Sequence, residues 1–361
     1  MLQRASLYHQ AGQPAKAEEI YRDILRNEPD NITAIMNLGC VLHDQGKLNE
    51  ALEMFRRAVK LKPDMPLAYI NLGGILCERG CLEESFTVFR RHAALTYEYE
   101  SNEPIQPHKA SHDREQQDYI NRNQRLNNEI AVNGFHIEDC SRVIIGGAVN
   151  PDASPGDVAT RWQGSHPKIV VIDNFLTDEA LAKLRRFCWR STIWRQVYTP
   201  GYLGAMPEHG IGSPLLAQIA EELRSTYPVI FGQYPLLHFW GFKYDSNLSG
   251  IALHADFAAV NVNFWITSDD ANRDPASGGL IIWDTPAPLD WDFAKYNDNV
   301  ATARDFLARA GAKSMTIPYR SNRVVIFDSN LFHETDRIDF KEGYLNRRIN
   351  LTLLYGRREA N

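Results

Sequence analysis

The sequence has few cysteines and no long hydrophobic run. Its five cysteines are an odd number, and their spacing suggests no disulfide framework. No apolar run reaches the roughly 18 residues that a membrane span needs. The opening residues, MLQRASLYHQ, lack the apolar core of a secretory signal. We therefore expect a cytoplasmic, reducing location and no membrane partner.

An excess of positive charge is also absent. Lysine and arginine total 39 against 45 aspartate and glutamate residues, for a net charge of −6. This balance argues against broad electrostatic binding to nucleic acid, so we expect no nucleic-acid partner. A hydrophobic content of 44% in 361 residues is ordinary for a globular protein and predicts two or three domains.

Residues 1–95 repeat with a period of 34. Small, aromatic and helix-ending residues recur at this spacing: Gly12, Gly46 and Gly80; Ala17, Ala51 and Ser85; Tyr21, Phe55 and Phe89; Pro29 and Pro63. The pattern resembles the tetratricopeptide repeat. That resemblance implies an all-α solenoid, in which small residues lie where paired helices cross and aromatic residues fill the gap to the next helix.

Asn37 and Asn71 occupy the same position in successive repeats, directly before Leu-Gly. An amide both donates and accepts hydrogen bonds, which suits an extended peptide backbone. Asparagines so placed resemble the ladder in the repeats of O-linked N-acetylglucosamine transferase. The resemblance implies a groove for a protein or peptide partner. The alternative is that both asparagines only cap or solvate their helices.

Residues 96–166 form a predicted connector. Its stretch 106–130 is polar and predicts a long exposed helix, followed by a loop rich in glycine and proline. We interpret His108, His112 and Asp113 as part of a solvated helix face rather than a metal site. Cys77 and Cys81, in the repeats before it, are interpreted as small buried side chains.

Residues 167–361 read as a strand-rich domain. Thr177 is a plausible N-cap for an amphipathic helix after the strand IVVID. From Leu236 onward, several short apolar strands alternate with glycine, asparagine and aspartate, and IALHAD is counted among them. This pattern predicts a double-stranded β-helix, or jelly roll, with flanking helices. The segment 285–313, with a helix near VATARDFLARAG, is long enough to act as a lid.

The pattern His254-Ala255-Asp256 lies in this strand-rich part. In an extended chain, residues two apart project from the same face, so this imidazole and carboxylate lie side by side. With a later histidine, for which His333 is the best candidate, they would form a 2-His-1-carboxylate triad that holds Fe(II). A second His-x-acid pair, His136 and Glu138, has no matching downstream residues, and we interpret it as structural.

Arg348, on the strand RRINLTLLY, could grip a carboxylate through two hydrogen bonds. The order His-x-Asp, distant His, then Arg resembles the Fe(II)/2-oxoglutarate-dependent dioxygenases of the prolyl-hydroxylase type, including the oxygenase domains that bacteria fuse to tetratricopeptide repeats. This resemblance implies Fe(II), 2-oxoglutarate and O2 as reactants and hydroxylation as the reaction. It assigns the distal carboxylate of 2-oxoglutarate to Tyr244, Arg348 and Thr352. The spacing after His333 leaves Arg347 open as an alternative anchor.

Two other functions remain open from the sequence. One is a scaffold, in which the repeats bind a partner and the barrel has lost catalysis. The other is a cupin-type metal enzyme that does not use 2-oxoglutarate. Trp283, Trp291 and Phe293 are candidates for the wall of a substrate pocket, and each is equally suited to an ordinary core.

Overall fold

The computed structural model describes residues 1–97, 106–127, 135–139, 143–151, 154–199 and 201–358. The chain divides into two compact units, Met1–Ser101 with Glu208–Gly212, and Asn102–Pro207 with Ser213–Asn361. The described helices of the predicted connector therefore belong to the second unit. None of the helices in the described part of the chain is long and apolar enough to cross a membrane.

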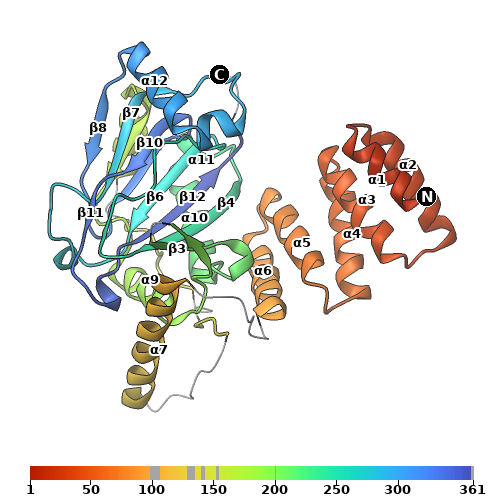
Figure 1. Ribbon diagram of the computed structural model, residues 1–361, viewed down its shortest axis with the longest axis horizontal. Helices are drawn as coiled ribbons and strands as arrows, with labels where there is room; N and C mark the ends of the chain where they lie inside the picture. Colours follow the sequence, from red (N-terminus) through yellow and green to blue (C-terminus); the bar gives the residue numbers. More distant parts are fainter. Residues whose placement is uncertain (98–105, 128–134, 140–142, 152–153, 200, 359–361) are drawn as a thin grey trace. The chain divides into compact units, whose positions relative to one another are not determined.

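The first unit consists of paired helices (Figure 1). They are α1 (Leu2–Gln10), α2 (Pro14–Asn27), α3 (Ile32–Asp44), α4 (Leu48–Leu61), α5 (Pro66–Glu78) and α6 (Leu82–Tyr97). Their inward faces share one apolar core, which includes Ile35, Leu38, Leu52 and Leu72.

The 34-residue period has a direct steric cause. A Cβ atom at Gly39 would lie 2.6 Å from the ring of Phe55, and one at Gly73 would lie 2.6 Å from the ring of Phe89. Only glycine permits this approach of helix to aromatic ring. The glycines that end the first helix of each pair have positive φ angles, of 68° at Gly12, 73° at Gly46 and 73° at Gly80.

Polar contacts between neighbouring repeats also recur. Arg22 contacts Glu50 at 2.5 Å, and Arg56 makes the equivalent contact with Glu84 at 2.8 Å. These exposed ion pairs add little stability, and the apolar core carries most of it. Cys77 is buried beside Ser85, as predicted, whereas Cys81 is exposed because it lies at the turn before α6.

The second unit is built on antiparallel sheets (Figure 1). A seven-stranded sheet has the order β1-β9-β6-β12-β4-β3-β2, a three-stranded sheet the order β10-β7-β8, and β11 pairs with β5. The strands are β1 (Ile169–Ile172), β2 (Gln196–Tyr198), β3 (Tyr202–Ala205), β4 (Leu236–Tyr244), β5 (Asn247–Leu248), β6 (Val260–Trp265), β7 (Leu280–Pro286), β8 (Ser314–Ile317), β9 (Val324–Asp328), β10 (Leu331–Thr335), β11 (Ile338–Asp339) and β12 (Ile349–Tyr355).

The two larger sheets share a core. Trp265 of β6 and Phe327 of β9 belong to the same buried cluster as Ile282 of β7 and Leu331 of β10. The helices of this unit are α7 (Pro107–Asn127), α8 (Pro155–Gly164), α9 (Asp178–Arg190), α10 (Pro214–Thr226), α11 (Pro228–Phe231) and α12 (Val300–Ala310). Thr177 caps α9 as predicted, since its side chain accepts a hydrogen bond from the amide of Ala180.

Helix α7 differs from the exposed helix that its polar sequence predicted. His112, Gln116 and Ile120 are buried on one of its faces. Gln116 donates to the carbonyl of Ser191 at 2.9 Å, and the ring of His112 lies 5.6 Å from that of Tyr344. The prediction of an exposed helix was wrong because polar side chains form this interface. Helix α7 therefore has no apolar stripe that would indicate its burial.

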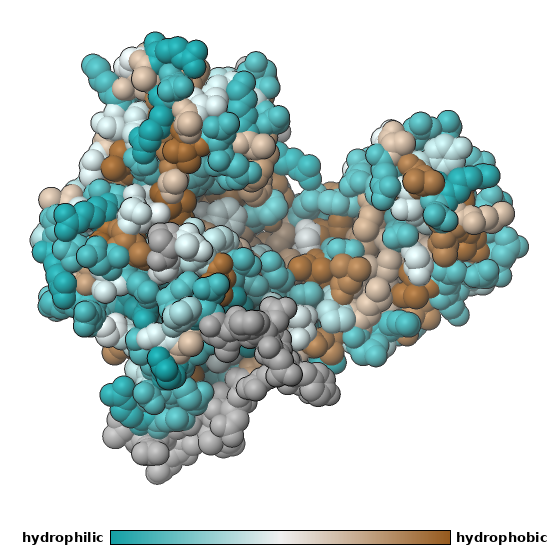
Figure 2. Space-filling view, in the orientation of Figure 1, coloured by the Kyte–Doolittle hydropathy of each residue, from teal (hydrophilic) through white to brown (hydrophobic). Residues whose placement is uncertain are grey.

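Hydrophilic side chains cover most of the face drawn in Figure 2, and hydrophobic residues are interspersed among them. Within the repeat unit, Leu7 is 58% exposed and Leu67 is 54% exposed. Single exposed apolar residues are normal on protein surfaces.

Candidate metal centre

His254 and Asp256 do not lie in a regular strand, although the sequence predicted one at IALHAD. His254 forms only an isolated antiparallel bridge with His333 of β10. The intervening Ala255 is held from elsewhere, because its amide donates to the carbonyl of Tyr296 at 3.0 Å and its carbonyl accepts from Asn297 at 2.8 Å. These contacts with the segment before α12 replace a sheet partner and keep the chain extended.

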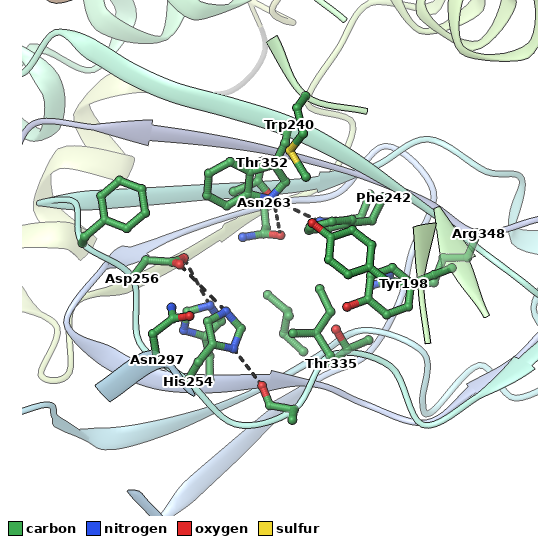
Figure 3. Close-up of a pocket in the computed structure, with 18 of the residues that line it drawn as sticks. Tyr198, Trp240, Phe242, His254, Asp256, Asn263, Asn297, Thr335, Arg348 and Thr352 are labelled. Carbon is green, nitrogen blue, oxygen red and sulfur yellow. Dashed lines mark hydrogen bonds and ion pairs between the residues drawn. The ribbon is translucent and has the colours of Figure 1, made fainter. Parts of the chain in front are cut away.

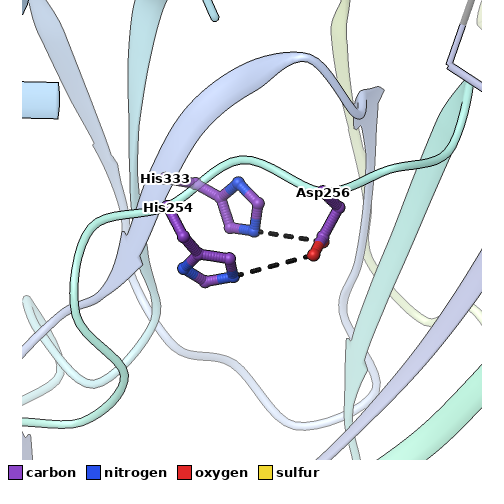
Figure 4. A group of neighbouring side chains, drawn as sticks. All are labelled: His254, Asp256 and His333. Atoms are coloured by element: carbon purple, nitrogen blue, oxygen red, sulfur yellow. Dashed lines mark ion pairs between the residues drawn. The ribbon is translucent and has the colours of Figure 1, made fainter. Parts of the chain in front are cut away.

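The three predicted ligands converge (Figure 4). His254 Nε2 lies 3.8 Å from Asp256 Oδ1, and His333 Nε2 lies 3.5 Å from Asp256 Oδ2. One ligand atom from each residue lies within 4.8 Å of the others. Among the described residues, no other group of three histidine, cysteine or acidic side chains meets this condition.

The hydrogen bonds of the two imidazoles fix which nitrogen faces the centre. Nδ1 of His254 lies 2.7 Å from the carbonyl of Ala252, and Nδ1 of His333 lies 3.0 Å from the carbonyl of Leu331. A carbonyl only accepts, so both Nδ1 atoms carry the proton. Two Nε2 lone pairs then face a carboxylate at distances too long for hydrogen bonds. Three acceptors that converge without a shared proton fit a bound cation.

Burial and the neighbouring His333 lower the pKa of His254 to about 4, so its imidazole is neutral at neutral pH. Burial raises the pKa of Asp256, but the two nearby imidazoles and the hydrogen bond from Asn261 outweigh that effect and lower it. His254 is therefore neutral and Asp256 ionised at neutral pH, the protonation states that a divalent metal ion requires of such ligands.

The three side chains line one end of a pocket of about 440 Å³, and Arg348 lines the other end (Figure 3). Asn263 and Thr352 lie between these ends, and Asn350 and Thr335 also contribute to the lining. Asp256 and Arg348 are the charged residues of the lining, apart from the histidines. The pocket thus holds a metal-type site and a fixed cation, both inside the same unit.

Arg348 is 1% exposed and lacks a counter-ion in the part of the chain that the structure describes. Its Nε donates to the carbonyl of Gly278 at 2.7 Å, whereas Nη1 is buried without a hydrogen-bond partner. The guanidinium lies 4.9 Å from the ring of Tyr244 and 5.6 Å from that of Trp265. The hydroxyl of Tyr244 and the indole N–H of Trp265 are also buried and unpaired among the described residues.

A buried cation that lines the pocket and retains an unused donor, Nη1, fits an anionic ligand such as a carboxylate. An unpaired buried donor leaves its desolvation penalty of about 1–3 kcal/mol uncompensated, and a carboxylate oxygen would supply the missing acceptor. Burial lowers the pKa of Arg348, while Tyr244 and Tyr319 raise it, and an arginine stays protonated at neutral pH.

Arg347, the alternative anchor, points away from this pocket. It contacts both carboxylate oxygens of Glu115 on α7, at 3.0 and 3.1 Å, and also pairs with Asp245. Its charge is therefore used to hold α7 against the sheet, and Arg348 supplies the cation of the pocket.

Tyr244 and Thr352, which the resemblance assigned beside Arg348, differ in their access to the pocket. Tyr244 is fully buried beside Arg348 and does not contribute to the pocket lining. Thr352 does line the pocket, but its hydroxyl donates to Asn263 Oδ1 at 3.2 Å. In this arrangement the proton of Thr352 is already used, so the threonine offers a carboxylate no donor.

Sequence reasoning missed the asparagines of β6 and most of the aromatic wall of the pocket. Asn261 and Asn263 are buried polar residues on that strand. Their signal was present, because Asn261 and Asn263 alternate with apolar residues in a strand that is otherwise buried. The pocket is also lined by Tyr198, Tyr202, Trp240, Phe242, Phe257 and Phe293. Of the predicted wall residues, Phe293 is in place, whereas Trp283 and Trp291 pack against a separate apolar cluster.

Comparison with known proteins supports the repeats. Family models described as TPR repeat and tetratricopeptide repeat match residues 39–80 and 1–39. The tetratricopeptide repeats predicted from the 34-residue period are thereby confirmed. No curated protein matches the chain.

Several solved structures resemble a part of the chain. An O-GlcNAc transferase from Thermobaculum terrenum is 29% identical, with a TM-score of 0.25, over 26% of this chain and 18% of its own. The Yersinia enterocolitica type III secretion translocator chaperone SycD is 16% identical, with a TM-score of 0.26. The match covers 28% of this chain and 68% of SycD. The first TPR of Spaghetti (RPAP3), bound to an HSP90 peptide, is 22% identical, with a TM-score of 0.25. The match covers 26% of this chain and 74% of that repeat domain. The matched region spans 53% of MamA, another of these structures.

Proposed function

We propose that the chain is an Fe(II)- and 2-oxoglutarate-dependent dioxygenase that hydroxylates its substrate. The observation that carries the proposal is one pocket with His254, Asp256 and His333 at one end. A buried Arg348, with no carboxylate as an ion-pair partner among the described residues, lies at the other end. Two antiparallel sheets with a common core support a double-stranded β-helix as its framework.

Each side chain has a distinct role in this proposal. Nε2 of His254 and of His333 and a carboxylate oxygen of Asp256 would hold Fe(II), and their backbone-bound Nδ1 atoms keep the rings oriented. Arg348, with Tyr244 behind it, would hold the distal carboxylate of 2-oxoglutarate. The bound iron supplies oxygen activation, in which 2-oxoglutarate, O2 and substrate C–H become succinate, CO2 and substrate C–OH.

The aromatic residues that line the pocket indicate the kind of substrate group that would fit there. Tyr198 and Tyr202 stack with ring centroids 4.7 Å apart, and Phe242 packs edge-on against both. These rings exclude water from the pocket and add no charge. The group to be hydroxylated would therefore be uncharged where it enters the pocket.

The repeats would recruit a protein or peptide, either the substrate itself or a partner. Tetratricopeptide repeats suggest protein–protein interaction, and stacked helix pairs present an extended surface for it. Asn37 and Asn71 are half-buried at equivalent positions of α3 and α5, so their amides remain our candidates for contacts with a peptide backbone.

An anaerobic titration of the full chain with Fe(II) and 2-oxoglutarate tests the proposal. We expect a weak visible band from the complex of ferrous iron with 2-oxoglutarate, and slow succinate formation once air is admitted. Both signals should disappear in His254→Ala and Asp256→Ala. No band and no succinate in folded, metal-loaded protein would favour the scaffold. Metal binding without 2-oxoglutarate binding would favour the cupin-type enzyme.

A further inference from the structure

A chain of hydrogen bonds runs from Asn350 on β12 to Asp256 at the metal end of the pocket. Asn350 Nδ2 donates to Thr352 Oγ1 at 3.1 Å, and Thr352 Oγ1 donates to Asn263 Oδ1 at 3.2 Å. Asn263 Nδ2 donates to Asn261 Oδ1 at 2.5 Å, and Asn261 Nδ2 donates to Asp256 Oδ2 at 2.6 Å. Figure 3 shows Asn263 and Thr352 between Asp256 and Arg348.

The strand register places the members of this chain. Asn261 and Asn263 are two residues apart on β6, as are Asn350 and Thr352 on β12, so each pair projects from one face of its strand. Thr352 and Asn263 are direct cross-strand partners. All of these side chains are buried, with exposures of 0 to 5%. A buried polar group needs a partner, and here each of the linking groups supplies one for the next.

The ionised carboxylate sets the direction of every bond in the chain. Asp256 can only accept, so Asn261 must present its NH2 group to it and its carbonyl to Asn263. Asn263 must then present its own NH2 to Asn261 and its carbonyl to Thr352, which must donate. The hydroxyl oxygen of Thr352 is left to accept from Asn350. Neither Asn261 nor Asn263 can reverse its amide without breaking two hydrogen bonds.

The two oxygens of Asp256 are thereby made unequal. Oδ2 accepts the short bond from Asn261, whereas Oδ1 receives no hydrogen bond in the described part of the chain and lies 3.8 Å from His254 Nε2. We propose that Asn261, Asn263 and Thr352 are positioning residues that hold Oδ2 and reserve Oδ1 of Asp256 for the metal ion. This inference rests on the proposed function only in requiring a metal ion at the triad.

Cobalt(II) tests the positioning role without turnover. Full-length protein, freed of metal, is titrated anaerobically with Co(II) in the absence of 2-oxoglutarate, and its visible d–d absorption gives both affinity and coordination. Asn261→Leu keeps the volume and removes the donor. We expect it to weaken Co(II) binding about tenfold or more, the usual effect of losing such a partner, and to change the spectrum at saturation because both carboxylate oxygens become available.

A matched pair at Thr352 tests the chain one step further away. Thr352→Val keeps the shape and removes the hydroxyl, whereas Thr352→Ser keeps the hydroxyl. We expect the valine variant to lose affinity about threefold or more, with a spectral change in the same direction as Asn261→Leu, and the serine variant to match the unmodified protein. Thermal unfolding of the metal-free proteins shows whether each variant is folded.

Two results would overturn the positioning role. The first is Co(II) affinity and spectrum unchanged in both Asn261→Leu and Thr352→Val. The second is weaker binding with an unchanged spectrum at saturation, which a purely structural role would produce. Failure of the proposed function has a different signature: the unmodified protein binds Co(II) through His254 with these spectral effects but forms no succinate with iron, 2-oxoglutarate and air.

Discussion

Arg347 and Arg348 are neighbours of the same residue type, and alternation along the chain at the start of β12 gives them opposite surroundings. Arg347 faces Glu115 and Asp245, which neutralise it. Arg348 faces a pocket in which no described carboxylate pairs with it. The strength of a charge in binding depends on whether it has already been compensated. Of the two arginines, Arg348 is the one with a buried nitrogen, Nη1, that has no hydrogen-bond partner in the described part of the chain.

We predict that Arg348→Gln weakens 2-oxoglutarate binding by about 10- to 100-fold, since a hydrogen bond to a charged group contributes about 1.5–3 kcal/mol. Co(II) affinity should change much less, because Arg348 lies at the opposite end of the pocket from the triad. Calorimetric titration of the metal-free protein with Co(II) measures the Co(II) affinity, and titration of the Co(II)-loaded protein with 2-oxoglutarate measures the 2-oxoglutarate affinity. Arg347→Gln is the matched control, which should lower stability and leave 2-oxoglutarate affinity unchanged. Equal losses of that affinity in the two variants would contradict the assignment.

At the scale of elements, helix α9 is fastened to the preceding segment by a buried carboxylate. Glu138 accepts from Arg186 at 2.6 Å and from Arg190 at 2.8 Å, and its own amide donates to Ser191. Burial raises the pKa of Glu138, but hydrogen bonds from His136 and both arginines outweigh it and lower the pKa to about 2. We interpreted His136 and Glu138 as structural from the sequence, and the structure adds Arg186 and Arg190 as partners of the buried acid.

Glu138→Gln should destabilise the second unit by about 3 kcal/mol at neutral pH, the free energy that corresponds to this pKa shift. Because the folded pKa lies below the ordinary value of 4.5, the stabilisation is complete above that value. It should decline as the pH falls from about 4.5 to about 2, so the difference between the two proteins should narrow over this range. Urea denaturation of both proteins at several pH values measures this difference in the free energy of unfolding.

The control for this experiment is an acidic residue on α9 itself. Glu179 forms an exposed pair with Lys183 at 2.7 Å. Glu179→Gln should change stability by no more than about 0.5 kcal/mol at any pH, as is usual for an exposed pair. A Glu138→Gln difference that does not depend on pH would show that Glu138 stabilises through packing rather than charge.

At the scale of the whole molecule, the two units have separate hydrophobic cores. The repeat core contains residues of α1 to α5, and the sheet core contains residues of both larger sheets. The pocket and the candidate metal site lie entirely within the second unit. Damage to the repeats should therefore leave the metal site intact.

Gly73→Ala tests this independence, because its Cβ would lie 2.6 Å from the ring of Phe89. We expect overpacking to destabilise the repeats by about 1–3 kcal/mol. Calorimetry should show the repeat transition at a lower temperature, with Co(II) affinity unchanged. Gly74→Ala on the same helix has open space around its Cβ and should not destabilise the repeats. A loss of Co(II) affinity in Gly73→Ala would mean that the units unfold as one.

Local rules determined much of this protein. The 34-residue period predicted the repeats, because close helix packing requires glycine at Gly39 and Gly73 and an aromatic ring opposite each. The strands β4, β6, β9 and β12 followed from short apolar segments separated by glycine, asparagine and aspartate, and the N-cap of α9 followed from Thr177. The candidate ligands were also identified from the sequence, since His254 and Asp256 are two residues apart in an extended chain and His333 follows in a strand.

Tertiary structure decided what depends on contacts between distant segments. The chain around Ala255 stays extended through contacts with Tyr296 and Asn297, which no local pattern encodes. Likewise, α7 is buried through polar contacts that give its sequence no apolar stripe. The choice of Arg348 over Arg347 required the position of Glu115, more than 200 residues earlier in the chain. The contact between Asn263 and Thr352 required the register of β6 against β12. Periodicity specifies which face a side chain occupies, and only the folded chain specifies what that face meets.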